Sequence, residues 1–195
     1  GSIFGAGAGG FRGPRRGRDL HAHLQIDPMF AIRGGETQIR IDRPDGSTEA
    51  LKVRIPAGVK DGGKLRLSGQ GHPPPGGGPC GDLVVELAVP EHPLFKREGD
   101  DLELEVPISV LEAMEGATIT VPTPTGDVNV NVPAGAQNGQ RMRVKGRGVQ
   151  RASEPGHLDL VLRPMLPTRL DPAALEAARV LQQAYEGDLR SKLHL

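Results

Sequence analysis

The sequence has very few cysteine and aromatic residues and no excess of either charge. A single cysteine, Cys80, excludes a disulfide framework within the chain and a cysteine-rich zinc site. Tryptophan is absent and aromatic residues make up 3% of the chain, so the core must be built from Val, Leu, Ile and Ala. Lys and Arg total 24, as do Asp and Glu, and this zero net charge argues against a protein whose main task is to hold nucleic-acid phosphate.

Long apolar runs are also missing. No stretch approaches the roughly 20 apolar residues that span a bilayer. Residues 1–18 lack the apolar centre of a signal peptide. We therefore expect a protein of a reducing compartment, cytoplasmic and without a membrane partner.

Glycine and proline, by contrast, are abundant, with 28 and 18 residues. This composition predicts dense turns and few long helices. Residues 1–18 are especially rich in glycine and contain four arginines and no acidic residue, so we expect a flexible linker there. A basic arm that touches nucleic acid is the alternative, although so few charges on a flexible segment bind weakly.

Short alternating segments make up most of the first half of the chain. Apolar residues occupy every second position in residues 20–26, 39–41, 51–55, 65–67 and 83–87. Stretches that contain Gly or Pro separate most of these segments. Period-two alternation bounded by turn residues is typical of antiparallel sheets.

One of these patterns occurs twice. Residues 55–71 align without gaps on residues 132–148, and seven positions are identical. The repeat extends upstream, where Asp19-Leu20 matches Asp101-Leu102 and Ile26 matches Ile108, and downstream, where residues 81–83 match residues 156–158. A unit of roughly 75 residues has the size of a small domain.

We therefore predict a mainly β fold with two tandem homologous antiparallel β-sandwich-like domains and a C-terminal helix. The predicted bounds are 1–18 for the linker, 19–92 for domain I, 93–167 for domain II and 168–195 for the helix. Residues 90–97 contain two prolines and are predicted to form a short hinge that restricts, but does not abolish, motion between the domains.

The C-terminal segment changes to helical periodicity. Asp171 is a candidate N-cap, Pro172 fits the first helical position, and residues 173–190 are rich in helix formers. One face of this helix carries Leu175, Ala178, Leu181, Tyr185 and Leu189. The face either caps domain II or meets its twin in a homodimer. We favour dimerisation, because a complete β unit leaves the helix little to cover in its own chain.

Catalytic and metal-binding patterns are weak. Cys80 lies in a loop rich in Pro and Gly, and His21 and His23 are two ligands with no third to complete a metal site. The glycine pairs at 69–71 and 146–148 are not followed by a helical pattern, so they do not form a nucleotide-binding motif. We expect no enzyme activity, no metal and no cofactor.

Binding of extended peptides is better supported. An exposed sheet edge pairs its backbone with a guest strand, and pockets beside it accept alternate side chains. Ala22, Leu24, Ile39 and Ile41 either form a shallow aliphatic groove or are ordinary core residues. The sequence leaves both alternatives open, because the two environments use the same residue types.

Several motifs in the same order resemble the C-terminal region of DnaJ-type co-chaperones. They are residues 54–62 (RIPAGVKDG), Gly81-Asp82-Leu83, residues 92–102 (HPLFKREGDDL), Pro133-Ala134-Gly135 and Gly146-Arg147-Gly148. The resemblance covers about residues 15–190. It implies a Gly/Phe-rich linker containing Phe4 and Phe11, two β-rich client-binding domains and a dimerisation helix. The His-Pro-Asp signature of a J domain does not occur, so we expect no ATPase stimulation by this stretch alone.

The chain resembles the zinc-less class B of this family, because only residues 42–50 stand where class A members insert a zinc-binding domain. Within that class it is similar to the curved-DNA-binding relatives. It implies a client groove on domain I lined by Ala22, Leu24, Ile39, Ile41 and Val85. It also implies that Arg40 contacts the acidic tail of a DnaK-type heat-shock chaperone. The expected partners are unfolded or misfolded clients, that chaperone and a second copy, with DNA binding through the arginines of residues 1–18 as the alternative.

Overall fold

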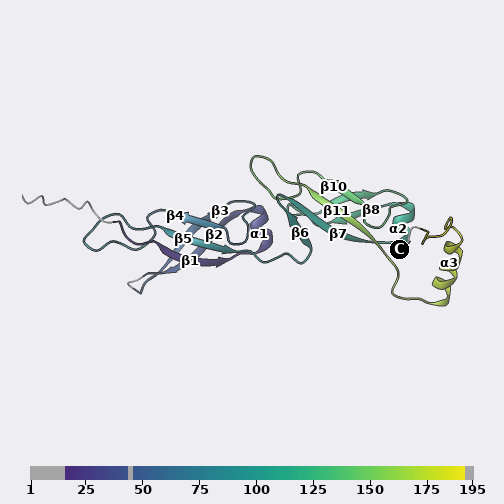
Figure 1. Cartoon of the computed structure of the whole chain (residues 1–195), viewed down its shortest axis with the longest axis horizontal. Coiled ribbons are helices and arrows are strands. Elements are labelled where there is room, and N and C mark those ends of the chain that lie inside the picture. Colours follow the sequence, from purple (N-terminus) through teal and green to yellow (C-terminus); the bar gives the residue numbers. More distant parts are fainter. Residues whose placement is uncertain (1–15, 44–45, 192–195) are drawn as a thin grey trace, which may run out of the picture.

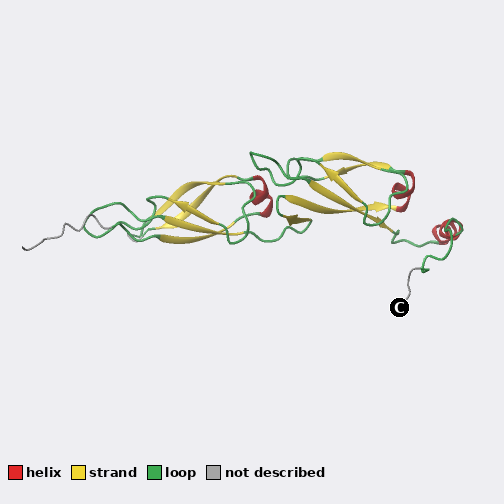
Figure 2. Cartoon of the chain, turned by 45° about the horizontal axis from the view of Figure 1, so that its top comes forward, coloured by secondary structure: helices red, strands yellow, loops and turns green. Residues whose placement is uncertain are grey.

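The computed structural model describes residues 16–43 and 46–191. They form two β units that lie end to end, followed by a helix (Figure 1, Figure 2). The predicted mainly β architecture of two tandem domains with a C-terminal helix is confirmed. Residues 1–15, which make up most of the predicted linker, lie outside the described residues, as do Pro44 and Asp45 of the 42–50 segment.

The first unit packs a three-stranded sheet against a hairpin. Its elements are β1 (Leu20–Gln25), α1 (Pro28–Arg33), β2 (Gly35–Asp42), β3 (Thr48–Ile55), β4 (Lys64–Leu67) and β5 (Leu83–Ala88). The sheet has the order β1-β5-β4, and β2 pairs with β3. Alternate side chains of the two layers meet in one core, where Leu83, Val85 and Leu87 of the central strand are fully buried.

The second unit repeats this plan with one additional strand. Its elements are β6 (Phe95–Glu98), β7 (Asp101–Ser109), α2 (Val110–Glu115), β8 (Ala117–Val121), β9 (Val128–Val132), β10 (Arg141–Val144) and β11 (Leu158–Met165). The sheet has the order β10-β11-β7-β6, and β8 pairs with β9. A second core forms here around Leu102, Leu158, Leu160 and Leu162.

Matching hydrogen bonds confirm the internal repeat. The N–H of Gly71 donates to the Gly81 carbonyl at 2.9 Å, and the N–H of Gly148 donates to the Gly156 carbonyl at the same distance. A Cβ on Gly71 would lie 2.6 Å from the backbone of Gly81, and one on Gly148 would lie 2.5 Å from the backbone of His157. Close backbone approach therefore explains why the second glycine of each Gly-x-Gly pair recurs.

The strand pairing differs from the prediction in one respect. Most pairs are antiparallel, but β1 pairs with β5 and β7 pairs with β11 in parallel. Each parallel pair joins the first and the last strand of the repeated unit. The chain between them includes a helix, a hairpin and a further strand, which provides the long crossover that parallel pairing needs.

Two short helices, α1 and α2, were not predicted. The Asp27 side chain accepts from the Phe30 N–H at 3.0 Å, and Pro28 follows at the start of α1. Ser109 and Glu112 form a reciprocal capping box at the start of α2. These caps are the sequence signals for both helices, but six residues are too few to show helical periodicity.

The C-terminal helix is shorter than predicted. α3 spans Pro172–Gln182, with Asp171 as its N-cap as expected, whereas the predicted helix continued to residue 190. Beyond Gln182 the chain tightens into i→i+3 bonds, from Gln183 to Val180 and from Ala184 to Leu181. The prediction that Tyr185 and Leu189 lie on the helical face is therefore wrong, whereas Leu175, Ala178 and Leu181 do lie on α3.

The junction between the units is more structured than the predicted hinge at 90–97. β6 begins within that segment, at Phe95, and pairs with β7. The Arg97 guanidinium donates to the carbonyls of Gly58 and Val59 at 2.7 Å each, and burial lowers the pKa of Arg97. Ile32 of α1 is buried in the core of the second unit. Contacts on both sides of the connecting segment thus hold the two units together.

Candidate functional site

The predicted groove residues separate into two groups. Ile39 and Ile41 of β2 are 5% and 4% exposed, and Val85 at the centre of the sheet is 0% exposed. Ala22 and Leu24 of β1 are half-buried and pack against the same core. Of the five predicted residues, then, only Ala22 and Leu24 retain substantial contact with solvent.

The strand register explains this division. Ala22 lies beside Val85 and Leu24 lies beside Leu87 in the parallel pairing, so the side chains of β1 extend the apolar face of β5. β5 is central in the sheet, whereas β1 is at its edge. Ala22 and Leu24 therefore lie at the margin of this apolar face, where they remain half-buried.

The strands β1 and β2 of the first unit each have an edge that is open for pairing. Among the described strands, β1 has β5 as its one sheet neighbour, and β2 has only β3. Unpaired backbone N–H and C=O groups on such edges can accept an additional strand. The same apolar core underlies both strands, because Leu24 of β1 and Ile41 of β2 belong to one cluster.

Leu20 is a candidate residue that the sequence prediction missed. It lies on the same face of β1 as Ala22 and Leu24, is half-buried, and packs against the same core. Its alternation with His21 was the signal that could have added it to the row. The apolar row on the open edge is therefore Leu20, Ala22 and Leu24.

Arg40, predicted to contact a partner's acidic tail, is exposed on β2. It lies between the buried Ile39 and Ile41, so its side chain belongs to the opposite, outer face of the hairpin, across from Ala50. That position provides a positive charge at the surface, away from the apolar face of the same strand.

A charged cluster fixes the start of β1. The buried Asp82 carboxylate pairs with the Arg16 and Arg66 guanidinium groups and accepts from the Gly69 N–H at 3.1 Å. These partners, led by Arg16, hold the pKa of Asp82 far below its usual range. The Asp82 N–H in turn donates to Asp19 at 2.7 Å, so the chain that enters β1 is attached to the end of the sheet.

Metal-binding candidates are not brought together in residues 16–43 and 46–191. No group of three or more His, Cys, Asp or Glu residues there could hold a metal ion. Cys80 is a half-buried free thiol, and His21 and His23 are exposed. No helix in this part of the chain is long and apolar enough to cross a membrane.

Two cavities, of about 600 and 870 Å³, lie where the two units meet. The smaller is lined by residues such as Val59, His92 and Phe95, and the larger by residues such as Arg33, Arg54 and Gln150. Neither is lined by a residue of the predicted groove. The candidate peptide site is therefore at the open edges of β1 and β2 and not in either of these two cavities.

Comparison with known proteins decides the family. Residues 14–167 match the family described as the DnaJ C terminal domain. This chain belongs to that family. The resemblance found from the sequence motifs is thereby confirmed.

Three curated relatives illustrate the similarity. A Curved DNA-binding protein of Pseudomonas syringae pv. tomato is 39% identical over 93% of this chain and 61% of its own length. A Chaperone protein DnaJ 2 of Corynebacterium efficiens is 38% identical over 91% of this chain and 43% of its own. A Curved DNA-binding protein of Escherichia coli is 46% identical over 63% of this chain and 40% of its own. The chain thus spans less than two thirds of the length of these relatives.

Proposed function

We propose that this chain is the client-binding part of a DnaJ-type co-chaperone and that it binds extended apolar segments of non-native proteins at the open strand edges of the first unit. The observation that carries the proposal is the half-buried row Leu20, Ala22 and Leu24 on the unpaired edge of β1. Ile39, Ile41 and Val85 then form the floor of the site from beneath.

The second unit provides an internal precedent for strand addition. Its strand β7 corresponds to β1, and β6 pairs antiparallel along the edge that β1 leaves open. Phe95 of β6 lies opposite Leu104, the counterpart of Ala22, and is buried. A client strand with a large apolar side chain opposite Ala22 would make the same kind of contact on the first unit.

Strand addition suits a broad range of clients. Main-chain hydrogen bonds provide affinity with little demand on guest sequence, and the apolar row selects for apolar side chains at alternate positions. Binding to non-native chains lowers the concentration that is free to aggregate. This binding step involves no covalent chemistry and no nucleotide.

Delivery and assembly complete the proposal. We propose that Arg40 receives the acidic tail of a DnaK-type chaperone, which its exposed positive charge on β2 supports. We also propose that the apolar face of α3, with Leu175, Ala178 and Leu181, forms a homodimer. Two copies would present two sites and raise avidity for long clients through effective concentration.

The proposal is tested by a substitution that introduces a negative charge into the apolar row of β1. Leu24→Asp should reduce the suppression of client aggregation severalfold, because a carboxylate disfavours apolar side chains at the edge. Gln25→Asp is the matched control, since Gln25 is the adjacent, exposed residue on the other face of the same strand. Full suppression by Leu24→Asp, with an unchanged fold, would rule out this site.

DNA binding is a second candidate, favoured by the names of two of the relatives above. In this chain Arg16 is already paired with Asp82, which removes one of the four arginines of residues 1–18 from the available charge. Affinity for duplex DNA should therefore be measured against salt concentration, with and without residues 1–18. A steep salt dependence that disappears with that segment would favour DNA binding.

A further inference from the structure

The smaller of the two cavities lies at the junction of the two units and is lined by both. Its volume of about 600 Å³ falls within the roughly 300–1,000 Å³ that is usual for small-molecule sites. Most of its wall comes from four segments: α1, the turn at residues 59–61, the connecting residues 89–92, and β6. A molecule bound there would therefore contact both units and the segment that joins them.

Apolar side chains from both cores line this cavity. Ile32 is 4% exposed and Phe95 is 5% exposed, and both belong to the core of the second unit. Val59 and Val89 are half-buried and pack against the core of the first unit. A flexible apolar chain in the cavity would bury surface against both cores.

A partly buried cation lines the same cavity and is only partly neutralised. The Arg97 side chain is 21% exposed and donates to the carbonyls of Gly58 and Val59. Among the described residues its one ion pair is with Asp100, at 3.8 Å, and Asp100 is hydrogen-bonded to Arg151 as well. Burial, with a smaller contribution from Arg151, lowers the pKa of Arg97. An anionic group in the cavity would supply additional negative charge.

Two hydrogen-bond donors at the cavity have no acceptor among the described residues. The Lys60 ammonium forms no hydrogen bond or ion pair there, although its charge acts on Asp100. The His92 Nδ1 accepts from the N–H groups of Leu94 and Phe95 at 3.0 and 3.1 Å. The proton of the neutral ring therefore lies on Nε2, which makes that nitrogen a donor.

The charges that line the cavity favour an anion over a cation. Lys60, Lys96 and Arg97 are opposed by two carboxylates, Asp61 and Glu91. Asp61 accepts from a backbone N–H at 2.8 Å, so part of its acceptor capacity is already used. Glu91 has no hydrogen bond or ion pair among the described residues, and it is the group that would oppose an anionic ligand.

We propose that this cavity binds an amphipathic anion, a flexible apolar chain that ends in one carboxylate, as in a medium-chain fatty acid. The chain packs against Val59, Val89 and Phe95, and the carboxylate accepts from Lys60 and His92 beside Arg97. Charge-assisted hydrogen bonds then select the anionic end group. None of the residues of the proposed client site lines the cavity, so this inference does not depend on the client-binding proposal.

The ligand class is tested by calorimetry of the full chain at pH 7 with three probes of equal chain length. Octanoate should bind at least about tenfold more tightly than octanol, which has no charge, and than octylamine, which is cationic. Equal affinity for octanoate and octanol would refute the selection of an anion. The absence of saturable octanoate binding would refute the site.

Three single-residue variants test the location. Lys60→Gln should weaken octanoate binding several-fold, and Glu91→Gln should strengthen it, because each removes one lining charge of opposite sign. Lys52→Gln is the matched control, since Lys52 is also exposed but lies on β3 outside the cavity, and it should leave the affinity unchanged. Both substituted lining residues are exposed, so the variants should fold, which circular dichroism verifies.

Two further measurements distinguish this cavity from the client site. Leu24→Asp should leave octanoate binding unchanged, and bound octanoate should slow hydrogen exchange of the backbone amides in residues 89–95. Loss of binding in Leu24→Asp with full binding in Lys60→Gln would place octanoate on the apolar row of β1 and overturn the proposal. Saturable binding with no change of exchange in residues 89–95 would overturn it as well.

Discussion

The two β units have one plan but leave opposite surfaces uncovered. In the first unit the surface around Ile32 of α1 is buried against the second unit, while the edge of β1 is open. In the second unit β6 covers the corresponding edge of β7, while the surface around Met114 of α2 is exposed. The two units therefore differ in the apolar surface that each leaves uncovered: the edge of β1 in the first unit and the surface around α2 in the second.

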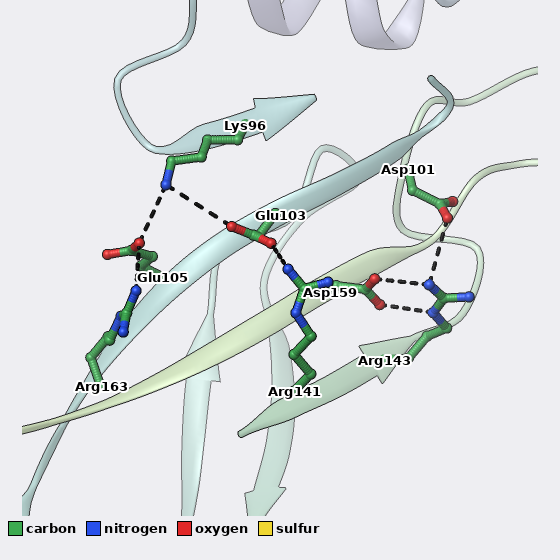
Figure 3. A network of polar contacts seen from close by, with 8 residues as sticks. All are labelled: Lys96, Asp101, Glu103, Glu105, Arg141, Arg143, Asp159 and Arg163. Atoms are coloured by element: carbon green, nitrogen blue, oxygen red, sulfur yellow. Dashed lines mark hydrogen bonds and ion pairs between the residues drawn. The ribbon is translucent and has the colours of Figure 1, made fainter. Parts of the chain in front are cut away.

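The two sheets also differ in where their ion pairs lie. Four basic and four acidic side chains form ion pairs across the second sheet, from β6 through β7 and β11 to β10 (Figure 3). Arg163 and Lys96 lower the pKa of Glu105, and Arg143 lowers the pKa of Asp159. On the first sheet, the ion pairs of Asp19 and Asp82 gather at the end where the chain enters β1. The charges thus tie the added strand β6 into the second sheet.

The largest expected effect concerns the floor of the proposed site. Ile41→Asp should unfold the first unit, with a loss of several kcal/mol, because a carboxylate would replace a side chain that is 4% exposed. Arg40→Asp, one residue away on the outer face, should leave the fold intact. Chemical denaturation followed by circular dichroism measures both. A folded Ile41→Asp variant would show that Ile41 faces solvent.

The next prediction concerns Phe95 of β6, the strand that covers the edge of β7 in the second unit. Phe95→Ala should destabilise the second unit by about 3–5 kcal/mol, since it deletes a buried aromatic side chain. Leu94→Ala, at the exposed neighbouring position, should cost little. A Phe95→Ala loss as small as that of Leu94→Ala would mean that β6 does not seal the edge of β7.

The third prediction concerns how the stability that Asp82 contributes to the first unit depends on pH. The pKa of Asp82 is lowered in the folded state, so its contribution to stability is present above the unfolded value of about 3.9 and is lost as the pH falls towards the folded value. Asp82→Asn should therefore be less stable than the unaltered chain at pH 7, with the difference shrinking at acidic pH. A difference that is independent of pH would contradict the pairing with Arg16 and Arg66.

The smallest effect concerns the ion pairs of the second sheet. Glu103→Gln should cost less than about 1 kcal/mol, and the loss should decrease at high salt, because surface ion pairs are weak and screened. His21→Gln alters the corresponding position of β1 and should have no comparable salt dependence. Thermal melts at low and high ionic strength provide the measurement.

Much of this fold could be predicted because its signals are local. Alternation located most strands, the repeated Pro-Ala-Gly and Gly-x-Gly motifs revealed two units, and Asp171-Pro172 marked the start of α3. The parallel pairing of β1 with β5 could not be predicted in this way, because it depends on contacts between distant parts of the chain. The end of α3 was missed because helix-forming residues continue past Gln182.

The candidate site was predicted less well, for a related reason. Leu24 and Ile41 both alternate with polar neighbours and both lie on strands with one sheet neighbour, yet Leu24 is half-buried and Ile41 is 4% exposed. Alternation identifies the apolar face of a strand but not what covers it. The layer that packs against each strand decides exposure, and that packing is a property of the assembled unit.

The most direct test of the proposed function is hydrogen–deuterium exchange of the chain with and without an extended apolar peptide. Strand addition predicts slower exchange of backbone amides in residues 20–25, residues 35–42 or both, because the open edges of β1 and β2 gain hydrogen-bond partners, while β7 is unchanged. Tight binding of the peptide with no protection in either segment would contradict the account.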